Sequence, residues 1–214
     1  MTPSLLPTTA IASLLCLACA TPALAQSADL NTWTKAGDVL INSATSATLT
    51  TDHPDESPLR LQFDGALLYF DLEAALSLQA GSLPADTLEG AGLQHSFDAA
   101  AGSTVRFDWL LTTAAFDAGQ ADRAFVLVDG QQLFTLGTVA AGVVSGQFSH
   151  SFASAGSHAL AIVVMDVNTA DGVSTLGISG FAVSAVPEPG QWALLMPGLA
   201  GLGTLLLRRR QSGG

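Results

Sequence analysis

The chain has 214 residues, 12% of them charged, with 18 acidic side chains against seven basic ones and a formal net charge of −11. So few charges exclude a helical bundle, whose exposed faces need many Glu, Lys and Arg residues, and an apolar fraction of 49% excludes a disordered chain. The acidic balance excludes nucleic acid as a partner, because phosphate backbones carry charge of the same sign.

The first element is an apolar segment over residues 10–20, and it is followed by Ala23, Leu24 and Ala25 ahead of Gln26. A short apolar segment before a small-x-small site predicts a signal peptide over residues 1–25, with cleavage between Ala25 and Gln26. The segment is too short for a membrane span. We therefore expect export through the Sec translocon, followed by removal of the segment by signal peptidase.

Both cysteines of the chain, Cys16 and Cys19, lie in this N-terminal segment. Lipoprotein processing at Cys19 is the alternative to cleavage after Ala25. We favour cleavage after Ala25, because a lipoprotein signal would have a Leu at the position of Cys16. A mature chain beginning at Gln26 would contain no disulfide, and a core of about 160 residues is large enough to fold without one.

Residues 26–186 are predicted to form one all-β domain, because apolar and polar residues alternate along most of it. In Thr104–Leu111, alternate residues from Val105 onward are expected to face the core. The Asp129-Gly130 pair predicts a tight type I′ hairpin turn, and the apolar run Ser157–Asp166 predicts a central strand.

The remaining strands complete a fold of nine or ten short strands, which we interpret as a two-sheet antiparallel sandwich of the jelly-roll type. The last strand shows a phase break that predicts a bulge at Ser179-Gly180. The other expected strands are Asp38–Ile41, Thr45–Thr51, Leu59–Phe63, Leu67–Leu72, Ala124–Val128, Gln131–Leu136 and Gln147–Phe152.

The sequence shows none of the residue spacings that are typical of a catalytic zinc site or a serine nucleophile. The four histidines, His53, His95, His150 and His158, show neither an H-x₃-H nor an H-E-x-x-H pattern. There is no G-x-S-x-G nucleophile elbow. The sequence therefore predicts no enzyme, no catalytic residue and no cofactor.

Calcium is the ion that the acidic residues favour, because its ligands are hard oxygen atoms. The candidates are Asp52, Asp55 and Glu56, which form the densest acidic cluster, together with Asp108 and Asp122. No D-x-D-x-D-G loop occurs, and a solvated acidic surface without any bound metal is the interpretation we favour.

The C-terminal segment, residues 187–214, has three parts: Pro187-Glu188-Pro189, an uncharged stretch Trp192–Leu207, and Arg208-Arg209-Arg210. A 16-residue helix spans about 24 Å, slightly less than the hydrocarbon core of about 30 Å, and snorkelling arginines cover the difference. The arginines predict a transmembrane helix with a cytoplasmic C-terminus.

In this order and at this end, the three parts resemble the PEP-CTERM sorting signal. The resemblance implies that Pro187, Glu188 and Pro189 are recognised by an exosortase, a membrane protease-transpeptidase, while Arg208, Arg209 and Arg210 orient the helix. The protein would reside in the inner membrane until it is cut near the Pro-Glu-Pro motif, and would then reach the cell surface or the medium. A plain C-terminal anchor is the alternative.

A second pattern lies inside the domain: Phe107-Asp108-Trp109, then Thr112-Thr113, then Asp122-Arg123-Ala124-Phe125-Val126. It resembles a pattern common in exported PEP-CTERM proteins. This resemblance supports the fold and the exported class, and it implies no activity.

Three functions remain open. The first is an exported surface or matrix protein associated with exopolysaccharide or biofilm. The second is a carbohydrate-binding, lectin-like module, which would present Trp or Tyr on a flat exposed face; the domain offers only Trp33, Trp109 and Tyr69. The third is a secreted hydrolase, which would need two convergent acids in a cleft.

Overall fold

The structure is a computed structural model that describes residues 29–52, 65–113, 120–167 and 172–184. All of these residues belong to one compact unit, Leu24–Val186. The predicted signal peptide, the predicted sorting tail and the predicted strand Leu59–Phe63 lie outside the described residues. Within the described ranges, no helix has the length and apolar character of a membrane span.

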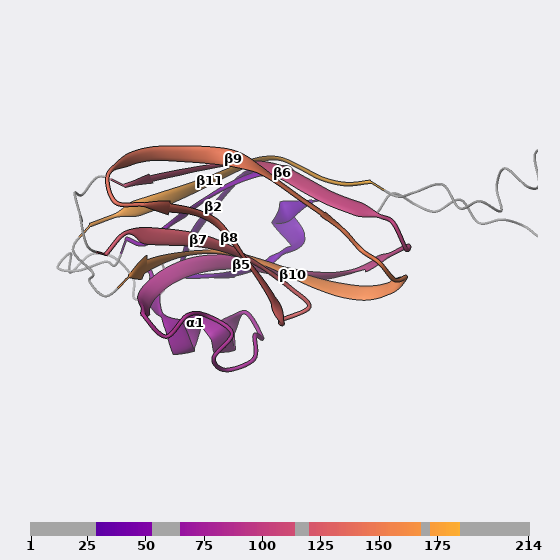
Figure 1. The fold of residues 1–214 in the computed structure, drawn as a ribbon, viewed down its shortest axis with the longest axis horizontal. Helices are drawn as coiled ribbons and strands as arrows, with labels where there is room; N and C mark the ends of the chain where they lie inside the picture. The colour runs from indigo at the N-terminus through magenta and orange to yellow at the C-terminus, as the bar shows by residue number, and fades with distance from the viewer. Residues whose placement is uncertain (1–28, 53–64, 114–119, 168–171, 185–214) are drawn as a thin grey trace, which may run out of the picture. The chain divides into compact units, whose positions relative to one another are not determined.

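The described part folds as two antiparallel sheets that lie face to face (Figure 1). In order, sheet A consists of β1 (Thr34–Ala36), β5 (Thr87–Ala99), β10 (Gly156–Val167), β7 (Asp122–Val128) and β8 (Gln132–Val139), and β4 (Leu67–Leu68) also pairs with β5. Sheet B consists of β2 (Asp38–Ser43), β3 (Ser46–Thr50), β11 (Ser174–Ser184), β6 (Thr104–Thr113) and β9 (Gly142–Ser151).

This topology confirms the predicted two-sheet antiparallel sandwich. Strands β3 and β5 to β11 follow the strand order of a jelly roll, while β1 and β2 each extend one edge. The 3₁₀ turn η1 (Leu30–Thr32) precedes β1 and contributes Leu30 to the core.

The core lies between the sheets, because every second side chain of a strand points inward. On β6, Val105, Phe107 and Leu111 are buried as predicted, whereas Trp109 is only partly buried. Each large apolar side chain that is fully buried stabilises the fold by about 1.5–3 kcal/mol. The shared core therefore supplies the main force that holds the two sheets together.

Two local predictions are confirmed residue by residue. Asp129 and Gly130, between β7 and β8, have φ angles of 54° and 66°, as a type I′ turn requires. On β11 the register shifts between Ser179 and Ala182, which is the predicted bulge. The extra residue changes the phase of the strand, so that Phe181 returns to the core.

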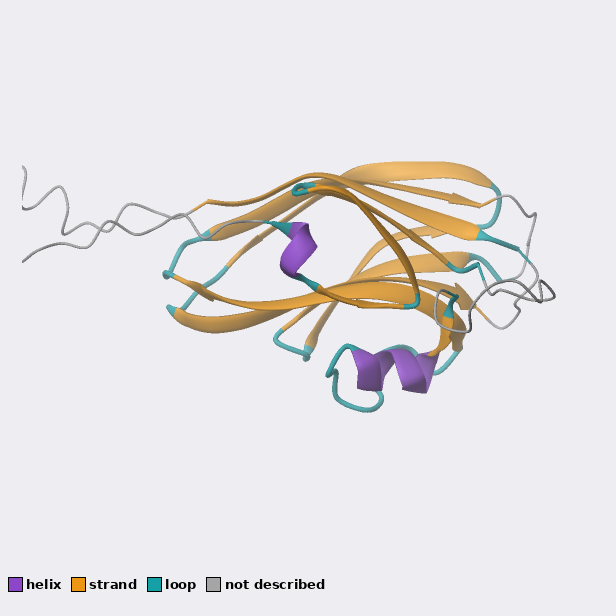
Figure 2. Ribbon diagram, turned by 180° about the vertical axis from the view of Figure 1, so that it is seen from behind, coloured by secondary structure: helices purple, strands orange, loops and turns teal. Residues whose placement is uncertain are grey.

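The predicted strand Leu67–Leu72 is wrong beyond Leu68, because the next residues form the helix α1 (Tyr69–Ala75). Leu72, Glu73 and Leu76 are buried, and spacings of three and four residues place them on one helical face. This face packs on the outer side of sheet A (Figures 1 and 2), against Phe125, Leu127, Ala161, Val163 and Met165.

Strand β5 is the longest in the described part, and the strand ranges expected from the sequence do not include it. Gly90 and Gly92 hide it, because glycine is unfavourable inside strands. A Cβ atom at Gly90 would lie 2.0 Å from the carbonyl oxygen of Val164, and one at Gly92 would lie 2.5 Å from Leu76 Cδ1. These glycines therefore allow β10 and the residue after α1 to pack closely on β5.

Candidate functional site

The outer face of sheet B is the broad open surface of the described part. The loop after α1 and the helix itself cover part of the outer face of sheet A, whereas no described element covers sheet B (Figures 1 and 2). Because a folded sheet normally buries one face and solvates the other, an open face alone assigns no function. The side chains that it presents decide what it could bind.

The antiparallel register arranges these outward side chains in rows that run across the strands. Neighbours within a row lie about 4.8 Å apart, and successive rows lie about 6.8 Å apart. The central row consists of Leu40, Thr48, Gly177, Leu110 and Ser145. One flanking row consists of Asp38, Thr50, Thr175, Thr112 and Val143, and the other includes Ser179, Asp108 and Gln147.

Hydrogen bonds between these side chains hold several of them in place. Gln147 Nε2 donates to Asp108 Oδ1 at 2.9 Å, and Asn42 Nδ2 donates to Thr48 Oγ1 at 2.8 Å. The hydroxyl of Thr50 donates to Asp38. The polar groups of this face are thus partly ordered before any ligand arrives, which lowers the entropy cost of binding.

Three exposed aliphatic side chains lie on the same face, on different strands. Leu40 is 63% exposed, Leu110 is 47% exposed and Val143 is 61% exposed. Leu110 occupies an outward position between Asp108 and Thr112 on β6, where the alternation calls for a polar residue. The centre of the face therefore combines an exposed aliphatic side chain with hydroxyl, amide and carboxylate groups around it.

Gly177 lies at the centre of the face, on the middle strand β11, and the backbone and packing do not require glycine there. A Cβ atom at Gly177 would meet only Leu110, at 3.8 Å from its carbonyl oxygen and 4.0 Å from its Cβ, which are ordinary contacts. The other described strand glycines have either a positive φ or a contact below 3.0 Å: Gly90, Gly92, Gly137, Gly142, Gly146, Gly156 and Gly180. Glycine within a strand often marks a bulge, a tight bend, or a site where a ligand or another backbone approaches closely.

The aromatic platform expected of a lectin-like face is not on the described part of sheet B. Trp33 is 5% exposed, and its ring packs in the core against Phe181 and His95, with centroid distances of 5.0 Å and 5.6 Å. Tyr69 begins α1 and packs on the other side of the molecule, against the outer face of sheet A. Trp109 points inward from β6.

Of the candidate calcium ligands that the structure describes, Asp108 and Asp122 lie in different sheets. Asp108 is exposed on the outer face of sheet B, whereas Asp122 is buried at the start of β7 in sheet A. Asp122 accepts hydrogen bonds from Ser174 Oγ at 2.5 Å and from the Val167 amide at 3.3 Å. Asp52 follows β3, and Asp55 and Glu56 lie outside the described residues.

Metal-ligating side chains do not cluster elsewhere in the described ranges either: no three His, Cys, Asp or Glu residues there are placed to hold an ion. The predicted sorting residues Pro187, Glu188, Pro189, Arg208, Arg209 and Arg210 lie outside the described residues, as do Ala23, Ala25 and Gln26.

Sequence reasoning missed the central row, although two signals pointed to it. Leu110 breaks the polar phase of its strand, and Gly177 interrupts the apolar pair Leu176 and Ile178. Neither signal shows by itself that the two residues are neighbours. Their pairing follows only from the register between β6 and β11.

No family model matches this chain, and no curated protein matches it. Solved structures with similar folds include a family 4 carbohydrate-binding module, 10% identical over 73% of this chain and 96% of that one, with a TM-score of 0.34. The N-terminal cellulose-binding domain of a Cellulomonas fimi β-1,4-glucanase is 11% identical over 73% and 90% of the two chains, with a TM-score of 0.33.

A family 35 carbohydrate-binding module from Cellvibrio japonicus is 11% identical over 69% of this chain and 95% of that one, with a TM-score of 0.31. Identities and TM-scores this low give no argument about what this chain binds. The case for a function therefore rests on the residues of the face itself.

Proposed function

We propose that this protein is a non-enzymatic, exported surface protein whose domain binds a neutral polysaccharide on the outer face of sheet B. The observation that carries the proposal is Gly177: a strand glycine without an internal cause, at the centre of the open face and beside exposed Leu110. A side chain there would hold a flat ligand away from the sheet.

The chemistry of the face matches that of a sugar ring. A pyranose presents C–H groups on its faces and hydroxyl groups around its edge. Leu110 and the bare backbone at Gly177 offer an apolar contact for the ring, while Thr48, Asp108 and Gln147 offer donors and acceptors within about one row of it. A few placed polar groups around an apolar contact are typical of sites for small polar ligands.

Charge favours a neutral polysaccharide over an acidic one. The described face carries Asp38, Asp108 and the exposed Arg106, and the whole chain has a formal net charge of −11. A polyanion would be repelled by the body of the protein at low ionic strength. We therefore expect neutral glycans to bind and uronate-rich glycans to bind less well.

We expect weak binding to each short stretch of polysaccharide. Aromatic rings supply much of the contact energy in many binding sites, and the described part of this face presents none. A dissociation constant on the order of 1 mM corresponds to about −4 kcal/mol. A polymer with many repeats and a surface with many copies of the protein would raise the overall avidity.

Localisation and sorting complete the proposal. The C-terminal resemblance supports passage through the inner membrane and cleavage by an exosortase, which would place the domain in contact with extracellular polysaccharide. The matrix role and the carbohydrate-binding role are then one function, since the open face would attach the released protein to exopolysaccharide or biofilm.

Affinity electrophoresis tests the binding. The processed protein is run through native gels containing neutral glucans, galactans or mannans, and through a gel containing an acidic glycan. We expect retardation in at least one neutral gel, loss of retardation in Gly177→Val, and no change in the control Thr135→Val on exposed β8 of sheet A. If no neutral glycan retards the protein, or if Gly177→Val is retarded as strongly as the parent, the proposal is wrong.

A further inference from the structure

A second feature of the domain lies on sheet A, at the end where the β7–β8 turn meets the segment between β9 and β10. His158, near the start of β10, is buried at 9% exposure, and its ring stacks on Phe152 with a centroid distance of 4.4 Å and an interplanar angle of 28°. On the adjacent strand β5, the residue paired with it is Phe97. The imidazole is therefore held in one orientation by its neighbours.

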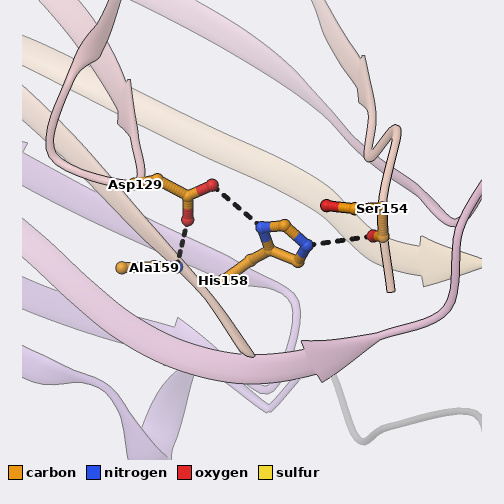
Figure 3. Close-up of polar contacts among 4 residues, drawn as sticks. All are labelled: Asp129, Ser154, His158 and Ala159. Atoms are coloured by element: carbon orange, nitrogen blue, oxygen red, sulfur yellow. Dashed lines mark hydrogen bonds and ion pairs between the residues drawn. The ribbon is translucent and has the colours of Figure 1, made fainter. Parts of the chain in front are cut away.

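Both nitrogen atoms of this ring face hydrogen-bond partners (Figure 3). Nδ1 lies 2.9 Å from Asp129 Oδ2, and Nε2 lies 3.1 Å from the backbone carbonyl oxygen of Ser154. The other carboxylate oxygen, Asp129 Oδ1, accepts a hydrogen bond from the Ala159 amide at 2.9 Å. One side chain thus connects the β7–β8 turn to the segment that follows β9.

The chemistry of these partners fixes the protonation of the ring. A carboxylate and a carbonyl oxygen can only accept hydrogen bonds, so each ring nitrogen must donate one. A neutral imidazole has one donor and one acceptor nitrogen, and it would leave one contact without a proton. Only the doubly protonated imidazolium satisfies both contacts at once.

We propose that Asp129, His158 and Ser154 form a pH-sensitive latch that closes this end of the sandwich while His158 is doubly protonated. When the ring loses a proton, one of its two hydrogen bonds is lost. The β7–β8 turn and the residues around Ser154 then separate more easily, while both sheets keep their pairing.

The electrostatic surroundings agree with the geometry. The hydrogen bond to Asp129 raises the pKa of His158 above its usual 6.5 by more than burial lowers it, and the Ser154 carbonyl adds to the rise. Burial raises the pKa of Asp129, but hydrogen bonds from His158 and Ala159 lower it more, so it lies below its usual 3.8.

The other titratable groups near the ring come from two strands. His150 on β9 contacts Phe152, with a centroid distance of 5.1 Å, and its positive charge, when present, further lowers the pKa of Asp129. On β5, His95 and Asp98 lie on either side of Phe97 along the strand. Asp98 is exposed and paired with Ser157, whereas the ring of His95 stacks on that of Phe97.

The direction of the pH effect follows from these shifts. His158 has a raised pKa, so its stabilisation is complete below the unfolded value and is lost as the pH rises through the folded value. Asp129 has a lowered pKa, so its stabilisation is present above the unfolded value and is lost as the pH falls through the folded value. The latch is therefore closed between these two folded pKa values, and it opens on the alkaline side when His158 deprotonates.

Histidine ¹⁵N NMR of the full chain tests the latch directly. Near neutral pH, we expect the spectrum to show His158 with protons on both ring nitrogens. The pH midpoint of the His158 titration should lie above the usual histidine pKa of 6.5. Above that midpoint, hydrogen-exchange protection factors should fall for the amides of Asp129 and Ala159 and stay constant for Val163 on the same strand. A neutral His158 near neutral pH, or a midpoint at or below the usual value, would overturn the proposal.

Variants separate the latch from general stability. Asp129→Asn should lower the His158 midpoint and should make the protection at Ala159 independent of pH. The control His150→Gln should leave the doubly protonated state of His158 in place. If Asp129→Asn leaves the titration midpoint of His158 unchanged, Asp129 does not hold the proton on the ring and the proposed latch is wrong. If a variant fails to fold, the titration of His158 in the parent protein decides the question.

Discussion

The indole of Trp109 lies directly against the backbone of Gly146, its paired residue on β9. A methyl group at Gly146 would come within 2.7 Å of ring atom Cζ2, and one at Gly137 on β8 would come within 2.9 Å of Cη2. Because β9 belongs to sheet B and β8 to sheet A, the ring spans the space between the two sheets beside their edge strands. The two glycines provide the room for this contact.

Gly146→Ala should therefore destabilise the domain, because the ring must move from its position or distort the strand. We expect a loss of about 1–3 kcal/mol in the free energy of unfolding, measured by urea denaturation followed by tryptophan fluorescence. The control Gly177→Ala makes the same change at a site where the new Cβ meets only ordinary contacts, and its free energy of unfolding should stay within about 0.5 kcal/mol of the parent value. Equal losses in the two variants would contradict this reading of the glycines.

Glu73 shows how α1 organises the chain that follows it. The side chain is buried, and its two carboxylate oxygens accept hydrogen bonds from the backbone amides of Gly81 and Leu83, at 3.0 Å and 2.8 Å. Glu73→Gln replaces one carboxylate oxygen by an NH₂ group, which then faces a backbone amide that is also a donor. The free energy of unfolding should fall by about 1–3 kcal/mol. Hydrogen exchange should show lost protection at Gly81 and Leu83, whereas exposed Asp71→Asn on the same helix should leave it intact.

The features that the sequence predicts best are those with local causes. The type I′ turn depends on Asp129 and Gly130 alone, and the bulge on β11 is visible as a change of phase between Ile178 and Phe181. Alternation within one strand identifies its inward face without knowledge of the neighbouring strands. Each of these properties depends on a few adjacent residues, so it can be predicted from the sequence alone, and the structure confirms it.

The features that were missed depend on distant residues. The sequence pattern does not predict β5, because Gly90 and Gly92 are unfavourable inside a strand. The contacts that require glycine at these positions come from β10 and from the residue after α1. The residues Leu67–Leu72 taken alone favour a strand. The spacing of buried residues that is typical of a helix becomes visible only when Leu76 is included. The contact between His158 and Asp129 and the pairing of Gly177 with Leu110 both require the register of the sheets, which a single sequence does not supply.

A buried hydrogen bond joins the start of β7 to the start of β11. Ser174 is fully buried, and its hydroxyl donates to Asp122 Oδ2. Ser174→Ala should lower the free energy of unfolding by about 1–3 kcal/mol, because the carboxylate loses a buried donor. The exposed Ser184→Ala at the other end of β11 should have little effect on thermal unfolding. A comparable loss at both positions would argue against a specific role for the Asp122 contact.

The sorting hypothesis makes a prediction about covalent structure. Intact mass of the protein recovered from envelope and medium fractions of the producing strain should give a species that begins at Gln26 and ends near Pro187–Pro189. A species that still carries Arg208, Arg209 and Arg210 in the inner membrane would show that the tail is an anchor. In that case the released-protein part of the proposed function would be wrong, while polysaccharide binding by the domain would remain open to its own test.

Chemical-shift mapping shows which face of the domain binds the polysaccharide. A short neutral oligosaccharide, taken from the polysaccharide that retards the protein most in native gels, is titrated into ¹⁵N-labelled protein. We expect shifts concentrated on the strands of sheet B around Leu110, Gly177 and Thr48, with no such shifts in Gly177→Val. Shifts centred on α1 or on the outer face of sheet A, or equal shifts in Gly177→Val, would contradict binding on sheet B.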